Sequence, residues 1–119
     1  MKLEERTIND VALVTVTGDL TSSRGADMIL KDKINSLLNQ KYRKLLIDLG
    51  GVGYMDSGGL GQLAAIQATV TRNGGKVKLV NVTRRLNDLL VVTRLLTVFE
   101  TFDGEAAALA SFGDTQGIG

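Results

Sequence analysis

The sequence of 119 residues contains no cysteine, no histidine and no proline. Without cysteine, the chain has no disulfide framework, no thiol chemistry and no thiolate metal site. Without histidine, it lacks the usual base of a serine hydrolase, and its carboxylates are scattered singly along the sequence. We therefore expect no catalytic residues of the hydrolase type, no metal site and no cofactor.

Long apolar runs are also missing. No segment approaches the roughly 18 consecutive apolar residues that span a bilayer, and residues 1–8 lack the apolar core of a signal peptide. Together with the absence of cysteine, this favours a cytoplasmic protein without membrane insertion. Hydrophobic residues make up 44% of the chain and charged residues 23%, which suits a single soluble domain. We expect this domain over residues 1–112, followed by a flexible tail over residues 113–119 that has little to bury.

A large net charge is absent as well, because the formal net charge is +1. Such a weak overall field does not steer acidic polymers toward the protein. Basic residues outnumber acidic ones between Arg72 and Arg94, but this stretch contains no aromatic side chain on which a base could stack. We interpret it as the solvated faces of a strand and a helix, and we expect no direct binding of nucleic acid.

What the chain does contain is an alternation of strand-like and helix-like patterns. It predicts an α/β domain, with a mixed but mainly parallel sheet of about four or five strands, an N-terminal hairpin turning at Asn9 and Asp10, and about four covering helices. The expected strands are residues 3–8, 11–17, 44–49, 76–80 and 99–102, and the expected helices follow capping residues at 21–23, 56–57, 83 and 103. The apolar residues expected to face the sheet from the first, third and last helices are Ala26, Leu30, Ile34, Leu37, Leu38, Leu86, Leu89, Leu90, Ala107, Leu109 and Phe112.

The most informative stretch is residues 48–61, which joins a strand to a helix and holds six glycines between positions 50 and 61. A glycine within a helix costs about 1 kcal/mol relative to alanine, so glycines in the first turn indicate the close approach of another surface, either the protein's own sheet or a partner. The free N–H groups of a helix start also favour an oxygen-rich or anionic group near Ser57. On the residues alone, N-capping by Asp56 or Ser57 is the favoured interpretation.

The expected topology brings a second loop to the same place. In open α/β sheets, sites form outside the carboxyl ends of the strands. The loop over residues 18–23 should emerge at the same edge as the glycine-rich stretch, so Asp19, Thr21 and Ser22 are expected to neighbour Asp56 and Ser57.

Several alternative motifs fail on the residues. The nucleophile elbow Gly-x-Ser-x-Gly has Met55 at its first position, and no Ser-x-x-Lys occurs, although counting alone leaves a Ser–Lys pair open. Residues 59–64 match a dinucleotide fingerprint formally, but the match starts inside the helix, and Asn81 stands where an acid would be expected. We interpret Asp48 as structural, holding the glycine-rich stretch through backbone N–H groups.

The run over residues 45–61, followed by residues 74–82, resembles the STAS domain, and within that family the stand-alone bacterial anti-sigma factor antagonists. The resemblance covers roughly residues 4–112. The chain departs from the family pattern at Gly58, where many members have a second Ser or Thr, and at Arg94, where a turn glycine is common.

This resemblance implies a function. The unphosphorylated protein would bind an anti-sigma factor that is also a serine kinase and would thereby release a sigma factor. Ser57 matches the serine that the kinase phosphorylates to end the binding, and a phosphatase acting on Ser57 would restore it. The protein would be a kinase substrate and not an enzyme. The residues expected to contact the partner are Asp19, Thr21, Ser22, Asp56, Gly58, Gly59 and Gly61.

Two other functions stay open on the sequence. One is a STAS adaptor in a signalling or lipid-transport complex, without phosphorylation. The other is a nucleotide-binding STAS module that uses the glycine-rich edge. Co-purification with membrane components would favour the first, and equilibrium dialysis with labelled GTP or ATP would decide the second.

Overall fold

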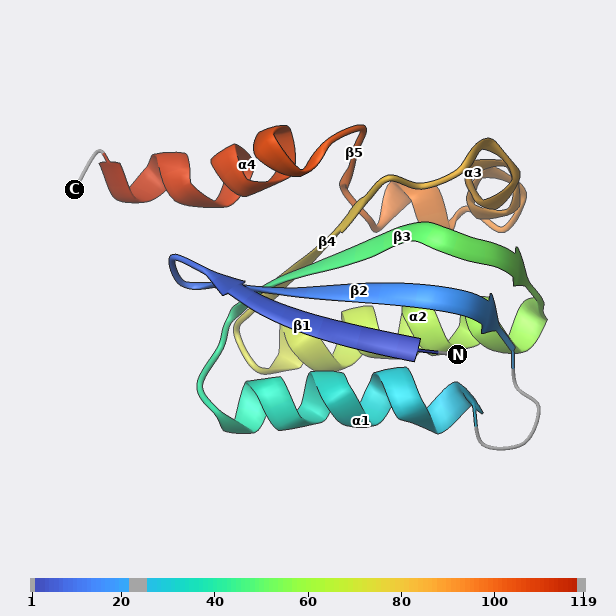
Figure 1. The fold of residues 1–119 in the computed structure, drawn as a ribbon, viewed down its shortest axis with the longest axis horizontal. Helices are drawn as coiled ribbons and strands as arrows, with labels where there is room; N and C mark the ends of the chain where they lie inside the picture. The colour runs from blue at the N-terminus through green and yellow to red at the C-terminus, as the bar shows by residue number, and fades with distance from the viewer. Residues whose placement is uncertain (1, 22–25, 118–119) are drawn as a thin grey trace.

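The structure, a computed structural model, describes residues 2–21 and 26–117 (Figure 1). The elements in chain order are β1 (Lys2–Ile8), β2 (Val11–Leu20), α1 (Ala26–Asn39), β3 (Lys44–Met55), α2 (Ser57–Arg72), β4 (Lys76–Val80), α3 (Arg84–Val92), the 3-10 helix η2 (Leu95–Thr97), β5 (Thr101–Phe102) and α4 (Glu105–Gly117). In the described part of the chain, no helix is both long enough and apolar enough to cross a bilayer.

The five strands form one sheet in the order β1-β2-β3-β4-β5. Strand β1 is antiparallel to β2, and the other neighbouring strands are parallel. The hairpin between β1 and β2 turns at Asn9 and Asp10, and Asn9 has a φ of 56°, a left-handed conformation that asparagine tolerates well. The predicted α/β fold, with its mainly parallel sheet and N-terminal hairpin, is confirmed.

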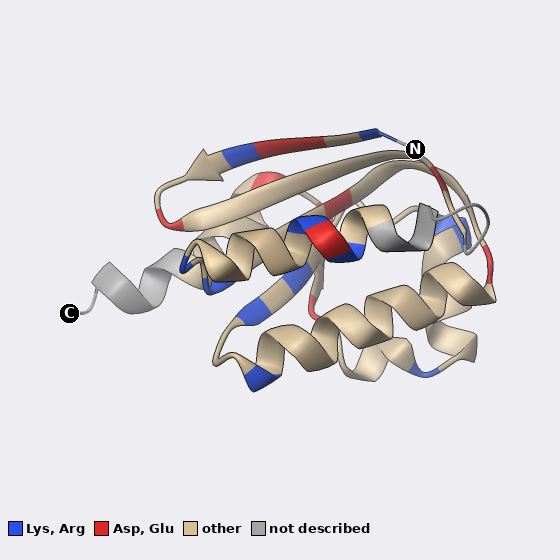
Figure 2. Cartoon of the chain, turned by 90° about the horizontal axis from the view of Figure 1, so that it is seen from below, with Lys and Arg blue, Asp and Glu red and all other residues tan. Residues whose placement is uncertain are grey.

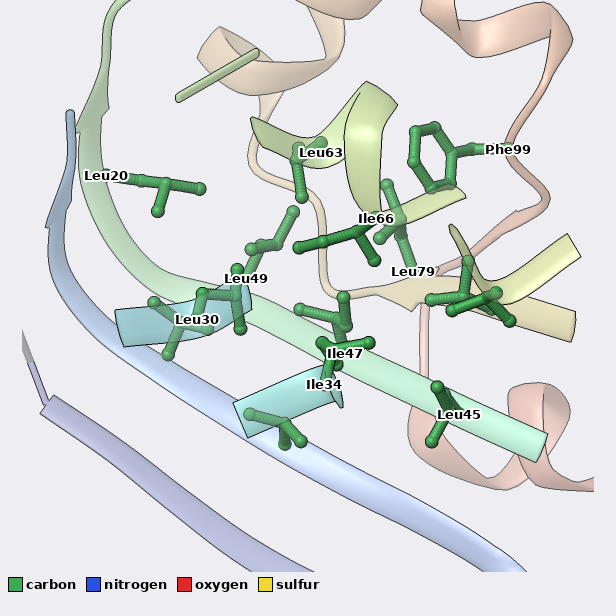
Figure 3. Packing of buried hydrophobic residues seen from close by; sticks show 14 of the residues in the cluster. Leu20, Leu30, Ile34, Leu45, Ile47, Leu49, Leu63, Ile66, Leu79 and Phe99 are labelled. Atoms are coloured by element: carbon green, nitrogen blue, oxygen red, sulfur yellow. The ribbon is translucent and has the colours of Figure 1, made fainter. Parts of the chain in front are cut away.

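The two faces of the sheet carry separate cores. Helices α1 and α2 cover one face, and their side chains interlock with those of β2, β3 and β4 (Figures 1 and 3). Helix α4 lies on the other face over a smaller cluster. The main core includes Leu20, Leu30, Ile34, Leu45, Ile47, Leu49, Leu63, Ile66, Leu79 and Phe99, and the smaller one consists of Val11, Leu13, Leu46, Val80, Ala108 and Phe112.

Most of the predicted helix faces are confirmed. On α1, four of the five predicted residues are buried, and the side chain of Ala26 lies outside the described ones. On α3, Leu86 and Leu90 are buried and Leu89 is half-buried. The prediction for Ala107 is wrong: it is exposed, and Ala108 is buried in its place. Ala108 shares a helix face with the buried Phe112, since residues four apart lie above one another.

The last helix also differs from the prediction at both ends. It begins at Glu105, so its N-cap position falls on Gly104 and not on Asp103. It continues beyond Phe112 to Gly117, so residues 113–117, which we expected to belong to a loose tail, are helical. Arg94, where the family pattern has a turn glycine, adopts a φ of 65°, the left-handed conformation that glycine favours.

The glycine-rich stretch after Leu49 is the main correction to the predicted strands. We expected β3 to end at Leu49, but it continues through the glycines to Met55. The extension pairs with β2, which likewise runs on to Leu20, and the pairing contains two register shifts. At Gly51 a Cβ atom would lie 3.1 Å from the carbonyl oxygen of Val16, so a side chain there would need the two strands to move apart by a few tenths of an ångström. The glycines therefore allow β3 to continue beside β2 where the register of the pairing shifts.

Asp48 has the structural role that the sequence predicts. Its Oδ1 accepts a hydrogen bond of 2.9 Å from the N–H of Gly50, and its Oδ2 accepts one of 3.2 Å from Nδ2 of Asn81. The carboxylate thus fixes the start of the glycine-rich stretch and links it to the end of β4.

Candidate functional site

The site lies where β2 and β3 end side by side and the chain enters α2. Leu20 is the register partner of Met55, and the N–H of Asp56 donates to the carbonyl oxygen of Leu20 at 3.4 Å. The end of β2 is therefore held against the start of α2. This is the edge at which sites form in open α/β sheets, as the carboxyl ends of parallel strands meet there.

Asp56 is the N-cap of α2. Its backbone is extended (φ −104°, ψ −175°), and its Oδ1 accepts a hydrogen bond of 2.9 Å from the N–H of Gly59. The side chain is half-buried. The sequence left the cap open between Asp56 and Ser57, and this geometry assigns it to Asp56, so the hydroxyl of Ser57 is not needed for capping.

Ser57 is the first residue of α2 and is exposed. Backbone N–H groups in the first turn of a helix lack acceptors within the helix, and the helix dipole adds a partial positive charge at the same place. An anionic group attached to Ser57 would therefore be placed where the helix stabilises it. The arrangement offers an accessible hydroxyl on a rigid support.

The two explanations for the helix glycines apply to different residues. Gly59 is buried, and a Cβ atom there would lie 2.2 Å from the carbonyl oxygen of Leu20, so this glycine serves the packing of α2 on its own sheet. Gly61 is exposed, and a Cβ atom there would meet nothing within 4 Å. Gly58 is half-buried. Close packing within the domain thus explains Gly59 but not Gly61.

The structure describes two of the three residues predicted for the flanking loop. Asp19 is exposed and is the register partner of Tyr54, two residues before Asp56. Thr21 is half-buried and directly follows the contact between Leu20 and the start of α2. Ser22, the third predicted residue of this loop, lies outside the described residues.

An apolar groove that the sequence did not reveal adjoins the site. It has a volume of about 480 Å³ and lies between the end of β3 and α3. Tyr54 and Val92 remain unusually exposed for residues of their type, at 49% and 79%. The only sequence signal was the pair of valines that ends α3. The groove is lined by Tyr54, Met55, Arg85, Asp88, Leu89 and Val92.

Comparison with known proteins places the chain in a family. The model of the STAS domain matches residues 2–108. The chain belongs to the STAS domain family. A protein of Thermotoga neapolitana, provisionally named as an anti-sigma factor antagonist, is 28% identical to this STAS domain over 102 residues, which are 86% of this chain and 89% of that protein.

Solved structures share the fold. The crystal structure of a Thermotoga maritima protein, provisionally described as an anti-sigma factor antagonist, matches with a TM-score of 0.83 and 23% identity, covering 92% of each chain. The phosphorylated form of the Bacillus cell fate determinant SpoIIAA matches with a TM-score of 0.72 and 15% identity, covering 93% of this chain and 99% of that one.

One buried polar side chain of α2 in this STAS domain lacks hydrogen-bond partners among the described residues. Gln62 is only 6% exposed, yet neither its Oε1 nor its Nε2 has a hydrogen-bond partner within the described part of the chain. A buried polar group without a partner has lost its bonds to water and gained nothing in return. No sequence pattern signals this, because satisfaction of an amide depends on its neighbours in space.

We expect Gln62→Met to raise the free energy of unfolding by about 1 to 2 kcal/mol, since methionine has a similar shape and carries no amide to desolvate. Urea denaturation followed by circular dichroism measures the change. Gln67→Met on the same helix is the matched control: Nε2 of Gln67 donates to the carbonyl oxygen of Val98 at 2.7 Å, so its loss should destabilise the domain. A loss of stability in both variants would show that the amide of Gln62 is satisfied in solution.

Proposed function

We propose that this STAS domain is an anti-sigma factor antagonist, which binds an anti-sigma factor and so frees a sigma factor. Phosphorylation of Ser57 by a serine kinase, which we take to be the anti-sigma factor itself, ends the binding. The observation that carries the proposal is the exposed Ser57 at the start of α2, next to an Asp56 that already caps the helix. The name of the Thermotoga neapolitana relative supports the same role.

The geometry favours a switch that acts at the surface and leaves the fold intact. A phosphate brings about −1.5 to −2 charges, and a helix N-terminus stabilises negative charge. Helix α2 should therefore persist after phosphorylation. The carboxylate of the adjacent Asp56 adds to the negative charge, so a partner fitted to a neutral hydroxyl is repelled by charge as well as by bulk.

The proposed partner surface extends on both sides of Ser57. Gly61 leaves one exposed position of α2 without a side chain, where another backbone can approach closely. On the other side, the apolar groove beginning at Tyr54 and Met55 offers area to bury. Asp19, Thr21 and Ser22 would flank this surface, with Asp56 and Gly58 at its centre. Gly59, which the sequence also predicted to contact the partner, is buried and supports this surface by letting α2 pack on the sheet.

In this proposal, the protein works in the cytoplasm as the substrate of a kinase and not as an enzyme. It requires no cofactor, does not bind nucleic acid directly, and influences transcription only through the sigma factor that it releases. A phosphatase that acts on Ser57 returns it to the binding form.

The first test is intact-mass spectrometry of the protein purified from its native cells, with and without phosphatase treatment. We expect a phosphatase-sensitive addition of one phosphate, about 80 Da, on the peptide that carries Ser57. The same cells expressing Ser57→Ala should lack the modified form. A protein that stays unmodified in every growth condition would overturn the switch and favour the adaptor function instead.

A further inference from the structure

A second feature lies at the opposite end of the sheet, where β3 and β4 begin. Lys44 and Lys76 are register partners on these adjacent strands, and Lys78 follows Lys76 on the same face, since alternate residues of a strand point to the same side. Figure 2 shows basic segments along β4 and at the start of β3. Like charges on neighbouring strands repel one another, so this pairing is unfavourable unless something offsets it.

The three lysines converge on a pocket between the sheet and α4. It has a volume of about 260 Å³ and is lined by Arg43, Lys44, Gly74, Lys76, Lys78, Ser111 and Phe112. All of its charged lining residues are basic. Ligand pockets for drug-sized molecules usually hold about 300 to 1,000 Å³, so this one suits a smaller ligand.

Lys78 lines the pocket, and its ammonium group has partners within the protein. The residue is 5% exposed, and its Nζ donates to Oγ of Ser111 at 2.9 Å. The Nζ also lies 3.4 Å from Oε1 of Glu100 and 4.5 Å from the centre of the Phe112 ring. The Ser111 hydroxyl donates its own proton to the carbonyl oxygen of Ala108 at 2.7 Å. Lys78 and Ser111 therefore form a hydrogen-bonded anchor for α4 and not a nucleophile with its base.

The charges around the pocket do not balance within the described residues. Asp10 pairs with Lys44 at 2.7 Å, and Glu100 pairs with Lys78. The Nη1 atom of Arg43 donates to two backbone carbonyl oxygens, at 2.8 and 3.0 Å, and not to a carboxylate. Lys76 is exposed and has no ion pair among the described residues. The guanidinium of Arg43 is thus held at the C-terminal end of α1, on the face of the sheet opposite to Lys44. Among the pocket's described lysines, Lys76 is the one without a carboxylate.

We propose that this pocket binds the phosphate group of a small molecule. A phosphate would lie between Lys76 and the outer side of Lys44, and would replace the repulsion between these two lysines with charge-assisted hydrogen bonds. Phe112 provides an apolar wall for the organic part of a phosphate ester. The site lies at the end of the sheet opposite Ser57, so it is distinct from the proposed phosphorylation switch.

The test is a titration of the full, isotope-labelled chain with inorganic phosphate, followed by NMR at constant ionic strength. We expect saturable shifts of amide signals over residues 74–78 and at Ser111. Lys76→Ala should weaken the apparent affinity by about three- to tenfold. Arg84→Ala makes the same change of charge at an exposed position of α3 outside the pocket and should leave the affinity unchanged.

Two further arms separate the sources of the phosphate. One uses glycerol 3-phosphate in solution, and the other uses phosphatidylcholine vesicles with and without phosphatidic acid. Binding that Lys76→Ala weakens and Arg84→Ala leaves unchanged would support the proposed site. If glycerol 3-phosphate binds in this way, the ligand is a soluble ester; if the vesicles with phosphatidic acid do, it is a lipid headgroup. Amide shifts that do not saturate would overturn the proposal, and so would an equal loss of affinity in Arg84→Ala and Lys76→Ala. The absence of binding to inorganic phosphate, to glycerol 3-phosphate and to the vesicles would overturn it as well.

Discussion

Replacing Gly59 by alanine is expected to lower the free energy of unfolding by about 3 kcal/mol, and to leave part of the protein unfolded if the domain has ordinary stability. The new Cβ atom would lie 2.2 Å from the carbonyl oxygen of Leu20 and 2.8 Å from Cγ of Met55. The side chain of Met55 can adjust, but the carbonyl belongs to β2, and the N–H of Asp56 donates to it. Helix α2 would have to move away from the sheet, and the contacts of its buried face would weaken.

Gly61→Ala is the matched control, because it makes the same chemical change two residues later in the same helix. Its Cβ atom would meet nothing within 4 Å, so the alanine gains helix propensity without a clash. We expect it to raise the free energy of unfolding by about 0.5 to 1 kcal/mol. Urea denaturation of the two variants measures both effects, and equal changes in the two would show that α2 is not packed on β2 as described.

The pair also bears on the proposed function. If a partner approaches the helix at Gly61, the alanine there should weaken binding to the anti-sigma factor although it stabilises the free protein. A variant that is more stable yet binds less well is difficult to explain by damage to the fold. Unchanged binding would remove Gly61 from the partner surface.

The contrast between these glycines shows what the sequence could and could not predict. A glycine run within a helical pattern indicates close approach, but the approaching surface depends on distances that only the fold sets. The carbonyl oxygen of Leu20 is far from Gly59 in sequence and touches it only through the pairing of β2 with β3. The same pairing carries β3 on to Met55, against the prediction that the strand ends at Leu49.

Local patterns predicted the elements better than the surfaces between them. The spacing of Leu30, Ile34 and Leu37 on α1 is decided within one helix, and the prediction holds. The groove beside Tyr54 and the pairing of Lys44 with Lys76 each join two segments of the chain, so their existence depends on register and helix placement. Candidate surfaces of this kind become visible only once the strands are paired.

The second large effect concerns binding to the anti-sigma factor. We expect Ser57→Asp to weaken it by about tenfold to a hundredfold, which corresponds to roughly 1.4 to 2.8 kcal/mol. The carboxylate would sit beside that of Asp56 at the surface that the partner must cover. Because an acidic residue at a helix start is favourable, the stability of the free protein should change by no more than about 1 kcal/mol.

Isothermal titration calorimetry with the anti-sigma factor measures the affinity, and thermal denaturation checks the fold. Ser36→Asp is the control for an added carboxylate, since Ser36 is exposed on α1 and lies outside the proposed surface. Ser57→Ala should bind as the wild type does, but should no longer be released when ATP is supplied to the kinase.

The outcomes distinguish a surface switch from a conformational one. If Ser57→Asp lost affinity together with a large part of its thermal stability, phosphorylation would act by disrupting α2. If the variant kept wild-type affinity and Ser57→Ala were still released by ATP, the switch would not reside at Ser57. Only loss of affinity with an intact fold agrees with the geometry, in which Asp56 caps the helix and leaves the hydroxyl of Ser57 free to be modified.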